Sequence, residues 1–260
     1  ILLMANKKGK ASGIIATLLI AGSALAFNQL DDVKELISDH LSNESHEDAK
    51  ASKDGQYSDS QKDYYTKKGK SNIQFSQFPK AGKYDYSNTD KLGRTQEAKA
   101  TINYKSFAKS KGVRQSFKAG SEPSGWGKNG KVKLKSADGT KTYNGYMYNR
   151  SHLIGDALGG DAIKENAITG TRPQNVGQPG TSTGGMRYSE SKVEKYMNTH
   201  KKGIVYYKAK PNYHDNEQLP RTVDVSMQSK DGQIDEKVRV FNNAKDYYID
   251  FKDGSYEKAK

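Results

Sequence analysis

Residues 148–155 read Tyr-Asn-Arg-Ser-His-Leu-Ile-Gly and follow an aromatic-rich run that is typical of a β-strand. Alternate residues of an extended strand point to the same side, so Arg150 and His152 are expected to share a face. A neutral imidazole can take a proton from water, and a guanidinium binds phosphate with two parallel hydrogen bonds. An anion between the two side chains would explain the pair. A half-buried histidine beside a surface arginine would also explain it.

Residues 166–175, Asn-Ala-Ile-Thr-Gly-Thr-Arg-Pro-Gln-Asn, are dense in amides and hydroxyls. Amide oxygens suit a hard cation such as Mg²⁺, which keeps several of its own waters. Asn and Thr also occur in ordinary loops, where they bond to the nearby backbone. The segment therefore leaves both a cation site and a capped loop open.

An acidic residue lies on the apolar face of a predicted helix, residues 187–202. Met186, Val193 and Met197 follow one stripe at helical spacing, and Glu190 lies on the same stripe. A carboxylate on an apolar face is costly unless it has a partner. That partner could be a metal with its waters, or a Lys or Arg in a salt bridge.

Short runs of alternating polar and apolar residues predict antiparallel strands with one solvated face. Turn signals such as Asp138-Gly139 separate them. The helix lies between two groups of strands, with Gly203 expected as its C-cap. The fold class is therefore α+β. The predicted strands are residues 131–135, 143–148, 203–209, 222–227, 237–241 and 247–251.

The composition excludes several classes of protein. The 260 residues contain no cysteine, which rules out a disulfide-stapled module, a thiolate zinc site and a cysteine nucleophile. A single short apolar stretch rules out a multi-span membrane protein. The net charge of +13 points to a polyanion, which could be nucleic acid, an anionic membrane or a cell-wall polymer. Charge alone does not choose among them.

The first residues have the layout of a secretory signal peptide. Lys7, Lys8 and Lys10 precede an apolar run, residues 13–26, which ends in an Ala-Leu-Ala cleavage pattern. We therefore expect residues 1–26 to be a signal peptide of a secreted protein. The alternative is an uncleaved anchor that holds the protein at the outer cell surface.

Two further segments follow. Residues 27–73 are read as an acidic leader and linker, with a short amphipathic helix over residues 31–42. Residues 74–260 are read as a globular domain. Within it, residues 180–184 match the G-x-S-x-G pattern of serine hydrolases, with Ser182 as nucleophile. No strand is expected before this pattern, so a flexible loop is favoured over a nucleophile elbow.

Taken together, these segments resemble the secreted and surface DNA/RNA non-specific endonucleases of Gram-positive bacteria, the streptococcal DNase type. The resemblance covers roughly residues 75–215. The matching stretches, in order, are Tyr86-Ser87 with residues 90–94, then residues 123–126, 148–155 and 165–172, then Asn175-Val176, and then residues 185–190.

The resemblance implies a ββα-metal (His-Me finger) motif set in a mixed or antiparallel sheet. His152 matches the general base of the family's D-R-G-H motif, and Arg150 matches its Arg. Two positions depart from the motif, because Asn149 replaces its Asp and Ser151 replaces its Gly. Loss of the Asp charge beside the histidine is expected to change the rate or the pH optimum.

The remaining site residues also follow from the resemblance. Asn175 matches the residue that binds Mg²⁺ directly, and Asn166 matches a supporting Asn. Glu190 matches the acid that orders metal-bound water, with Glu194 as a weaker candidate. Arg172 is expected to help bind the substrate and to stabilise the charged transition state, and Asn149 is assigned to substrate binding.

The resemblance therefore implies a Mg²⁺-dependent endonuclease, with Mn²⁺ able to substitute. It would hydrolyse phosphodiester bonds of DNA, and of RNA as a further candidate substrate, with little sequence preference and with 5′-phosphate ends. No small-molecule cofactor is expected. Contact with a membrane is expected only through an uncleaved N-terminal segment. The alternative is a non-catalytic protein that binds DNA or a cell-wall polymer.

Overall fold

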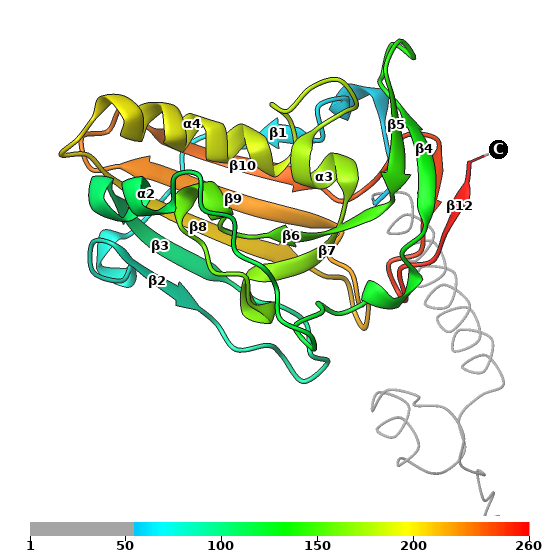
Figure 1. Ribbon diagram of the computed structural model, residues 1–260, viewed down its shortest axis with the longest axis horizontal. Helices are drawn as coiled ribbons and strands as arrows, with labels where there is room; N and C mark the ends of the chain where they lie inside the picture. The colour runs from blue at the N-terminus through cyan, green and yellow to red at the C-terminus, as the bar shows by residue number, and fades with distance from the viewer. Residues whose placement is uncertain (1–54, 260) are drawn as a thin grey trace, which may run out of the picture. The chain divides into compact units, whose positions relative to one another are not determined.

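The computed structural model describes residues 55–259 and centres on a six-stranded antiparallel sheet (Figure 1). The predicted signal segment and most of the acidic leader lie outside the described residues. Among residues 55–259, no helix has the length and apolar character needed to cross a bilayer. In sheet order the strands are β1 (Tyr65–Lys67), β10 (Asp235–Phe241), β9 (Thr222–Ser229), β8 (Ile204–Asn212), β3 (Ala98–Asn103) and β2 (Lys83–Tyr86).

One face of this sheet carries the main core. Along β8, Val205, Tyr207 and Ala209 alternate with more exposed residues and are fully buried, as the sequence pattern predicts. They pack in one cluster with the apolar stripe of α4 (Met186–Thr199) and with α2 (Tyr104–Ser110). The sheet and these helices thus form two layers, with α4 lying across the strands (Figure 1).

A second, smaller core lies beside the first. It gathers Leu134, Met147, Tyr148 and Phe251 beneath two hairpins. The hairpins are β4 (Lys131–Lys135) with β5 (Thr142–Tyr146), and β11 (Tyr247–Ile249) with β12 (Tyr256–Lys258). Short 3₁₀ helices span Asp59–Gln61, Phe75–Gln77, Trp126–Lys128, Asp156–Leu158 and Lys164–Asn166.

A separate two-stranded unit lies in front of the main sheet. β6 (Tyr148–His152) pairs antiparallel with β7 (Ala167–Thr171), and α3 (Arg172–Val176) follows at once (Figure 1). The Thr171 hydroxyl accepts the Gln174 N–H at 3.1 Å, which fixes the start of this short helix. The order strand, strand, helix is the ββα arrangement that the family resemblance implied around His152.

The predicted α+β class is confirmed, with two local corrections. Residues 143–148 do not form one strand. The chain turns at Met147, whose buried side chain fills the second core and whose carbonyl accepts the Arg172 N–H at 2.7 Å. The helix also ends at Thr199 rather than near Gly203. His200 has a φ of −115° there, and its ring stacks on Tyr196 at 4.2 Å.

The folded unit begins before residue 74, the boundary that the sequence suggested. β1 adds an edge strand to the sheet by pairing with β10. Tyr64, directly before it, is 1 % exposed, and its hydroxyl accepts the Lys245 N–H at 3.2 Å. This strand could not be predicted from the sequence, because the three residues of β1 show no apolar alternation.

A chain that starts at residue 74 is expected to be less stable than one that starts at residue 55. It loses the burial of Tyr64, and burying a large aromatic side chain is worth about 3 kcal/mol or more. Unfolding in urea measures the difference. Tyr64→Ala in the longer chain should reproduce a large part of the loss. Equal midpoints for the two chains would place residues 55–73 outside the cooperative fold.

Candidate active site

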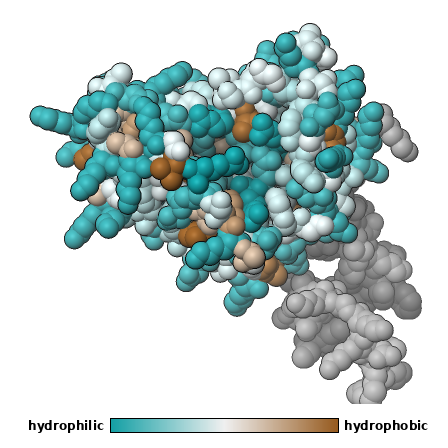
Figure 2. Space-filling view, in the orientation of Figure 1, coloured by the Kyte–Doolittle hydropathy of each residue, from teal (hydrophilic) through white to brown (hydrophobic). Residues whose placement is uncertain are grey.

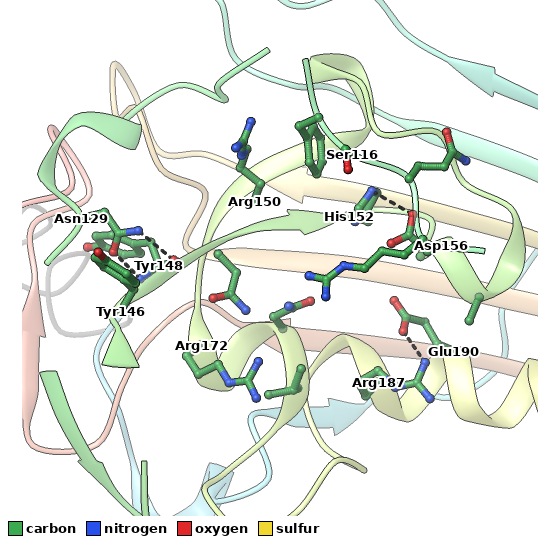
Figure 3. Close-up of a pocket in the computed structure, with 18 of the residues that line it drawn as sticks. Ser116, Asn129, Tyr146, Tyr148, Arg150, His152, Asp156, Arg172, Arg187 and Glu190 are labelled. Atoms are coloured by element: carbon green, nitrogen blue, oxygen red, sulfur yellow. Dashed lines mark hydrogen bonds and ion pairs between the residues drawn. The ribbon is translucent and has the colours of Figure 1, made fainter. Parts of the chain in front are cut away.

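A cavity of about 960 Å³ opens between β5, β6, α3 and α4 (Figure 3). It lies on a face that is mostly hydrophilic, with small hydrophobic spots scattered over it (Figure 2). The sequence-predicted site residues that line it are Asn149, Arg150, His152, Arg172, Asn175 and Glu190. Residues that are distant in the sequence therefore meet in one place.

His152 ends β6 and shares a face with Arg150, as predicted. Both side chains contact Phe117. Its ring centroid lies 4.8 Å from that of His152 and 4.9 Å from the Arg150 guanidinium carbon. Arg150 also lies over Trp126 at 5.6 Å, so its cation is held between two aromatic faces. Phe117 was not singled out from the sequence, because it comes from a loop that only the tertiary fold brings here.

The surroundings of His152 favour its neutral form. Burial lowers the pKa of His152 below 6.5, and Arg114 lowers it further, while Asp156 and Asp161 oppose the shift. Nε2 of His152 lies 3.6 Å from Oδ1 of Asp156 (Figure 3). Both atoms are buried without a hydrogen-bond partner among the described residues. A neutral imidazole nitrogen that makes no hydrogen bond and faces a carboxylate can accept a proton.

Asn175 projects from α3 into the same cavity. Its Oδ1 accepts a hydrogen bond of 3.2 Å from the hydroxyl of Ser151, which is fully buried in β6. Ser151 is the position where the sequence departs from the expected Gly, and here its side chain orients Asn175. An amide oxygen has two lone pairs, so Oδ1 retains one for a second partner.

Glu190 lies on α4 and is 5 % exposed. Burial raises the pKa of Glu190, and the Arg187 cation opposes that rise. Nη1 of Arg187 donates to Glu190 at 2.7 Å and to Glu194 at 2.6 Å. The salt bridge that the sequence left open is therefore present. Of the two acids, Glu190 lines the cavity and Glu194 does not.

Asn166, like Glu194, does not line the cavity. It is fully buried, and its Oδ1 accepts the Ile154 N–H at 2.9 Å. Its Nδ2 donates to the carbonyls of Ile154 and Asp161 at 3.0 and 2.9 Å. This differs from the grouping of Asn166 with the catalytic residues, because its amide is occupied in holding the loop after His152.

Several arginines make the cavity positive. Arg150 and Arg172 were expected there, and Arg114 and Arg187 were not. Arg172 lies over the ring of Tyr143 at 5.1 Å. A spacing of three residues on one helix could have linked Arg187 to Glu190 from sequence alone. No comparable signal existed for Arg114.

Ser182 does not have the setting of a hydrolase nucleophile. It is exposed in a loop, it does not line the cavity, and the element before it is the short helix α3 rather than a strand. The serine-hydrolase alternative is therefore wrong.

The oxygen donors that the cavity offers to a cation include the amide of Asn175 and the buried carboxylate of Glu190, and Asn149 and Asp156 also line it. Among residues 55–259, no group of three or more His, Cys, Asp or Glu side chains is arranged to hold a metal ion. Asn175, which retains a lone pair, and Glu190, which lines the same cavity, fit an ion that takes few protein ligands and keeps its waters.

Gly155→Ala is expected to lower any activity of this cavity by about tenfold to a hundredfold without unfolding the protein. A Cβ at this position would lie 2.5 Å from Oε1 of Glu190 and would push the carboxylate aside. The backbone allows alanine, because φ is −65°. Gly127→Ala, whose Cβ would meet nothing within 4 Å, is the matched control. A Gly155→Ala protein with full activity and an unchanged melting temperature would show that the position of Glu190 is unimportant.

Comparisons with known proteins agree with this arrangement. Residues 75–231 match the family model of DNA/RNA non-specific endonucleases. A deoxyribonuclease of Streptococcus dysgalactiae subsp. equisimilis is 35 % identical over 239 residues, which cover 74 % of this chain and 72 % of that protein.

Solved structures give the same picture. The structure of Sda1 nuclease with bound zinc ion is 34 % identical, with a TM-score of 0.74 over 78 % of this chain and all of that one. NucA of Streptococcus agalactiae with magnesium bound is 23 % identical, with a TM-score of 0.54 over 73 % of this chain and 83 % of that one. The second likeness concerns the fold alone. The fold class with its ββα-metal motif, β6–β7–α3, is thus confirmed.

Proposed function

The chain belongs to the DNA/RNA non-specific endonuclease family, and from this premise we propose that it cleaves DNA, and RNA as a second substrate, with His152 as general base. One observation carries the proposal. Nε2 of His152 is buried, makes no hydrogen bond among the described residues and lies 3.6 Å from Asp156, in a cavity that also holds Arg150, Asn175 and Glu190. The alternative, a non-catalytic polyanion-binding protein, gives no reason for a buried imidazole without a hydrogen bond beside these groups.

In the proposed reaction, His152 takes a proton from a water molecule, and the oxygen of that water attacks phosphorus. The bond between phosphorus and the 3′ oxygen breaks, this oxygen takes up a proton from a second water molecule, and a 5′-phosphate end remains. Asp156, 3.6 Å from Nε2, stabilises the imidazolium once it has formed. The neutral resting state follows from burial, which lowers the pKa of His152.

The arginines supply positive charge for the phosphate. Arg150 and Arg172 are each held against aromatic rings, which leaves the edges of their guanidinium groups available for phosphate oxygens. Nη1 of Arg150 lies 4.0 Å from Oε1 of Glu122. At this distance the ion pair is weak, so Glu122 does not prevent Arg150 from binding phosphate. Contacts to backbone phosphate carry no base information, so sequence preference is expected to be weak.

We assign the metal of this family to Asn175 and propose Mg²⁺, with Mn²⁺ as a substitute. Bound there, the ion would neutralise charge that develops on the phosphate oxygens. Oδ1 of Asn175 would bind it directly, and Glu190 would accept hydrogen bonds from its water shell. Ser151 would keep Oδ1 pointed at the ion. The donor set supports Mg²⁺ because hard oxygens are its preferred ligands.

The N-terminal pattern supports a proposal about localisation. Residues 1–26 would direct export, and either cleavage or retention of the segment would leave the catalytic domain outside the cell. No cofactor besides the metal is proposed.

Plasmid digestion tests the proposal. The chain from residue 27 should nick and then fragment plasmid DNA with Mg²⁺ or Mn²⁺, and EDTA should stop it. Products should be labelled by polynucleotide kinase only after phosphatase treatment, because their 5′ ends carry phosphate. A parallel reaction with RNA measures the second substrate. DNA that is retarded in a gel but left intact with both metals would instead support the polyanion-binding alternative.

A further inference from the structure

The β4–β5 hairpin has one basic face that is exposed along its whole length. In an antiparallel pair, directly opposite residues point to the same side of the sheet. Three such pairs form this face, and all six residues are exposed. We call it the lysine face, and its pairs are Lys131 with Tyr146, Lys133 with Asn144, and Lys135 with Thr142.

The opposite face of the hairpin fixes this orientation. Leu134 is 1 % exposed in the second core, and Val132 and Tyr143 pack against the same cluster. A slip of one residue in the strand would bury lysines and expose these apolar groups, so the register is strongly specified. The lysines are therefore held outward by the fold.

The charge of the lysine face is not used within the protein. Among the described residues, Lys131, Lys133 and Lys135 have no ion pair. Residues 131–146 contain a single acid, Asp138 in the turn. Its carboxylate already accepts hydrogen bonds from the Ser136 hydroxyl at 2.5 Å and the Thr140 N–H at 3.0 Å.

The lysine face starts at the catalytic cavity. Tyr146 belongs to the face and also lines the cavity, and it is 53 % exposed. Lys131 is directly opposite Tyr146, and Lys133 and Lys135 follow at steps of two residues. At about 3.4 Å per residue, the row of lysines continues for roughly 14 Å beyond the cavity wall. The hairpin projects away from β6 and α3 (Figure 1).

We propose that the lysine face binds backbone phosphates of the DNA strand that leaves the cavity past Tyr146. The proposal rests on the function proposed above, and it adds a binding surface outside the cleaved bond. The row of unpaired cations matches a row of phosphates in charge, and its continuity with the cavity gives the strand one direction. An anionic membrane fits less well, because apart from Tyr146 the face presents no large apolar side chain to insert.

Salt-dependent binding tests the proposal. The variant is Lys131→Gln, Lys133→Gln and Lys135→Gln. The control is Lys68→Gln, Lys80→Gln and Lys83→Gln, which removes the same charge from exposed lysines that do not line the cavity. Both are made in full-length protein carrying His152→Ala, so that the DNA is not consumed, and the Kd for duplex DNA is measured from 50 to 200 mM NaCl.

Each phosphate contact contributes about 0.9 to the slope of log K against log salt. Loss of three contacts should reduce the slope by nearly 3. The loss of affinity between 50 and 200 mM salt would then be about 40-fold smaller than in the parent. The control should keep the parental slope. Equal slopes for variant and control would overturn the proposal. Cleavage by the chain with native His152 is scored separately, so failure of the proposed function is distinguishable from failure of this surface.

Discussion

His152→Ala should reduce the rate of DNA hydrolysis by a factor of about 10²–10⁴ and leave the fold intact. Nε2 of the imidazole is a buried proton-accepting atom in the cavity that makes no hydrogen bond among the described residues, and Asp156 lies 3.6 Å away, where it stabilises the protonated ring. Its loss removes the base but no hydrogen bond that the fold depends on. The measurement is kcat/KM on plasmid DNA at saturating Mg²⁺, together with the melting temperature.

His214→Ala is the matched control. His214 is partly exposed beside Asp215 and does not line the cavity, so its loss should change neither rate nor stability. A His152→Ala protein that keeps more than a tenth of the parental rate would remove His152 from the role of base.

The pH profile separates a base from a merely structural histidine. Burial places the pKa of His152 below 6.5, so the imidazole should accept protons at neutral pH and lose that ability as the pH falls through its pKa. Asp156 raises this pKa, so Asp156→Asn should move the acid limb of kcat/KM to lower pH. If the acid limb of kcat/KM stays at the same pH in this variant, a group other than His152 controls it.

Local patterns predicted three of the six strands of the main sheet, and β1, β2 and β3 were not predicted. Alternation placed β8, β9 and β10 because one face of each is buried in the main core. Helical spacing placed Glu190 on the buried stripe of α4, where the structure has it. Such regularities act over a few residues, so they can be read from the chain before its tertiary fold is known.

Features made by distant segments could not be predicted in this way. Phe117 reaches His152 from a loop 35 positions earlier, and the Ser151–Asn175 hydrogen bond depends on how α3 packs against β6. The break at Met147 exists because a second core needs that side chain. A sequence pattern shows which residues seek burial, but it does not show which of two cores receives them.

Asn175→Ala should lower cleavage by about 10²–10³-fold and weaken binding of Mg²⁺. The alanine lacks the oxygen that we assign to the ion, and a metal that stabilises transition-state charge is worth several kcal/mol. Calorimetric titration of Mg²⁺ into the protein without DNA gives a readout that does not depend on activity. Asn198→Ala, at an exposed position of α4, is the control and should match the parent in both measurements.

Ser151→Ala sharpens this test. The change removes the 3.2 Å hydrogen bond that orients Oδ1 of Asn175 but keeps the ligand itself. Partners that orient a ligand typically contribute 10- to 100-fold in metal affinity. Mg²⁺ affinity should therefore fall in the order parent, Ser151→Ala, Asn175→Ala. If Asn175→Ala binds Mg²⁺ as the parent does, the ion is held elsewhere in the cavity, and Glu190 with its Arg187 partner becomes the place to look, because it is the other oxygen donor that we assign to the ion.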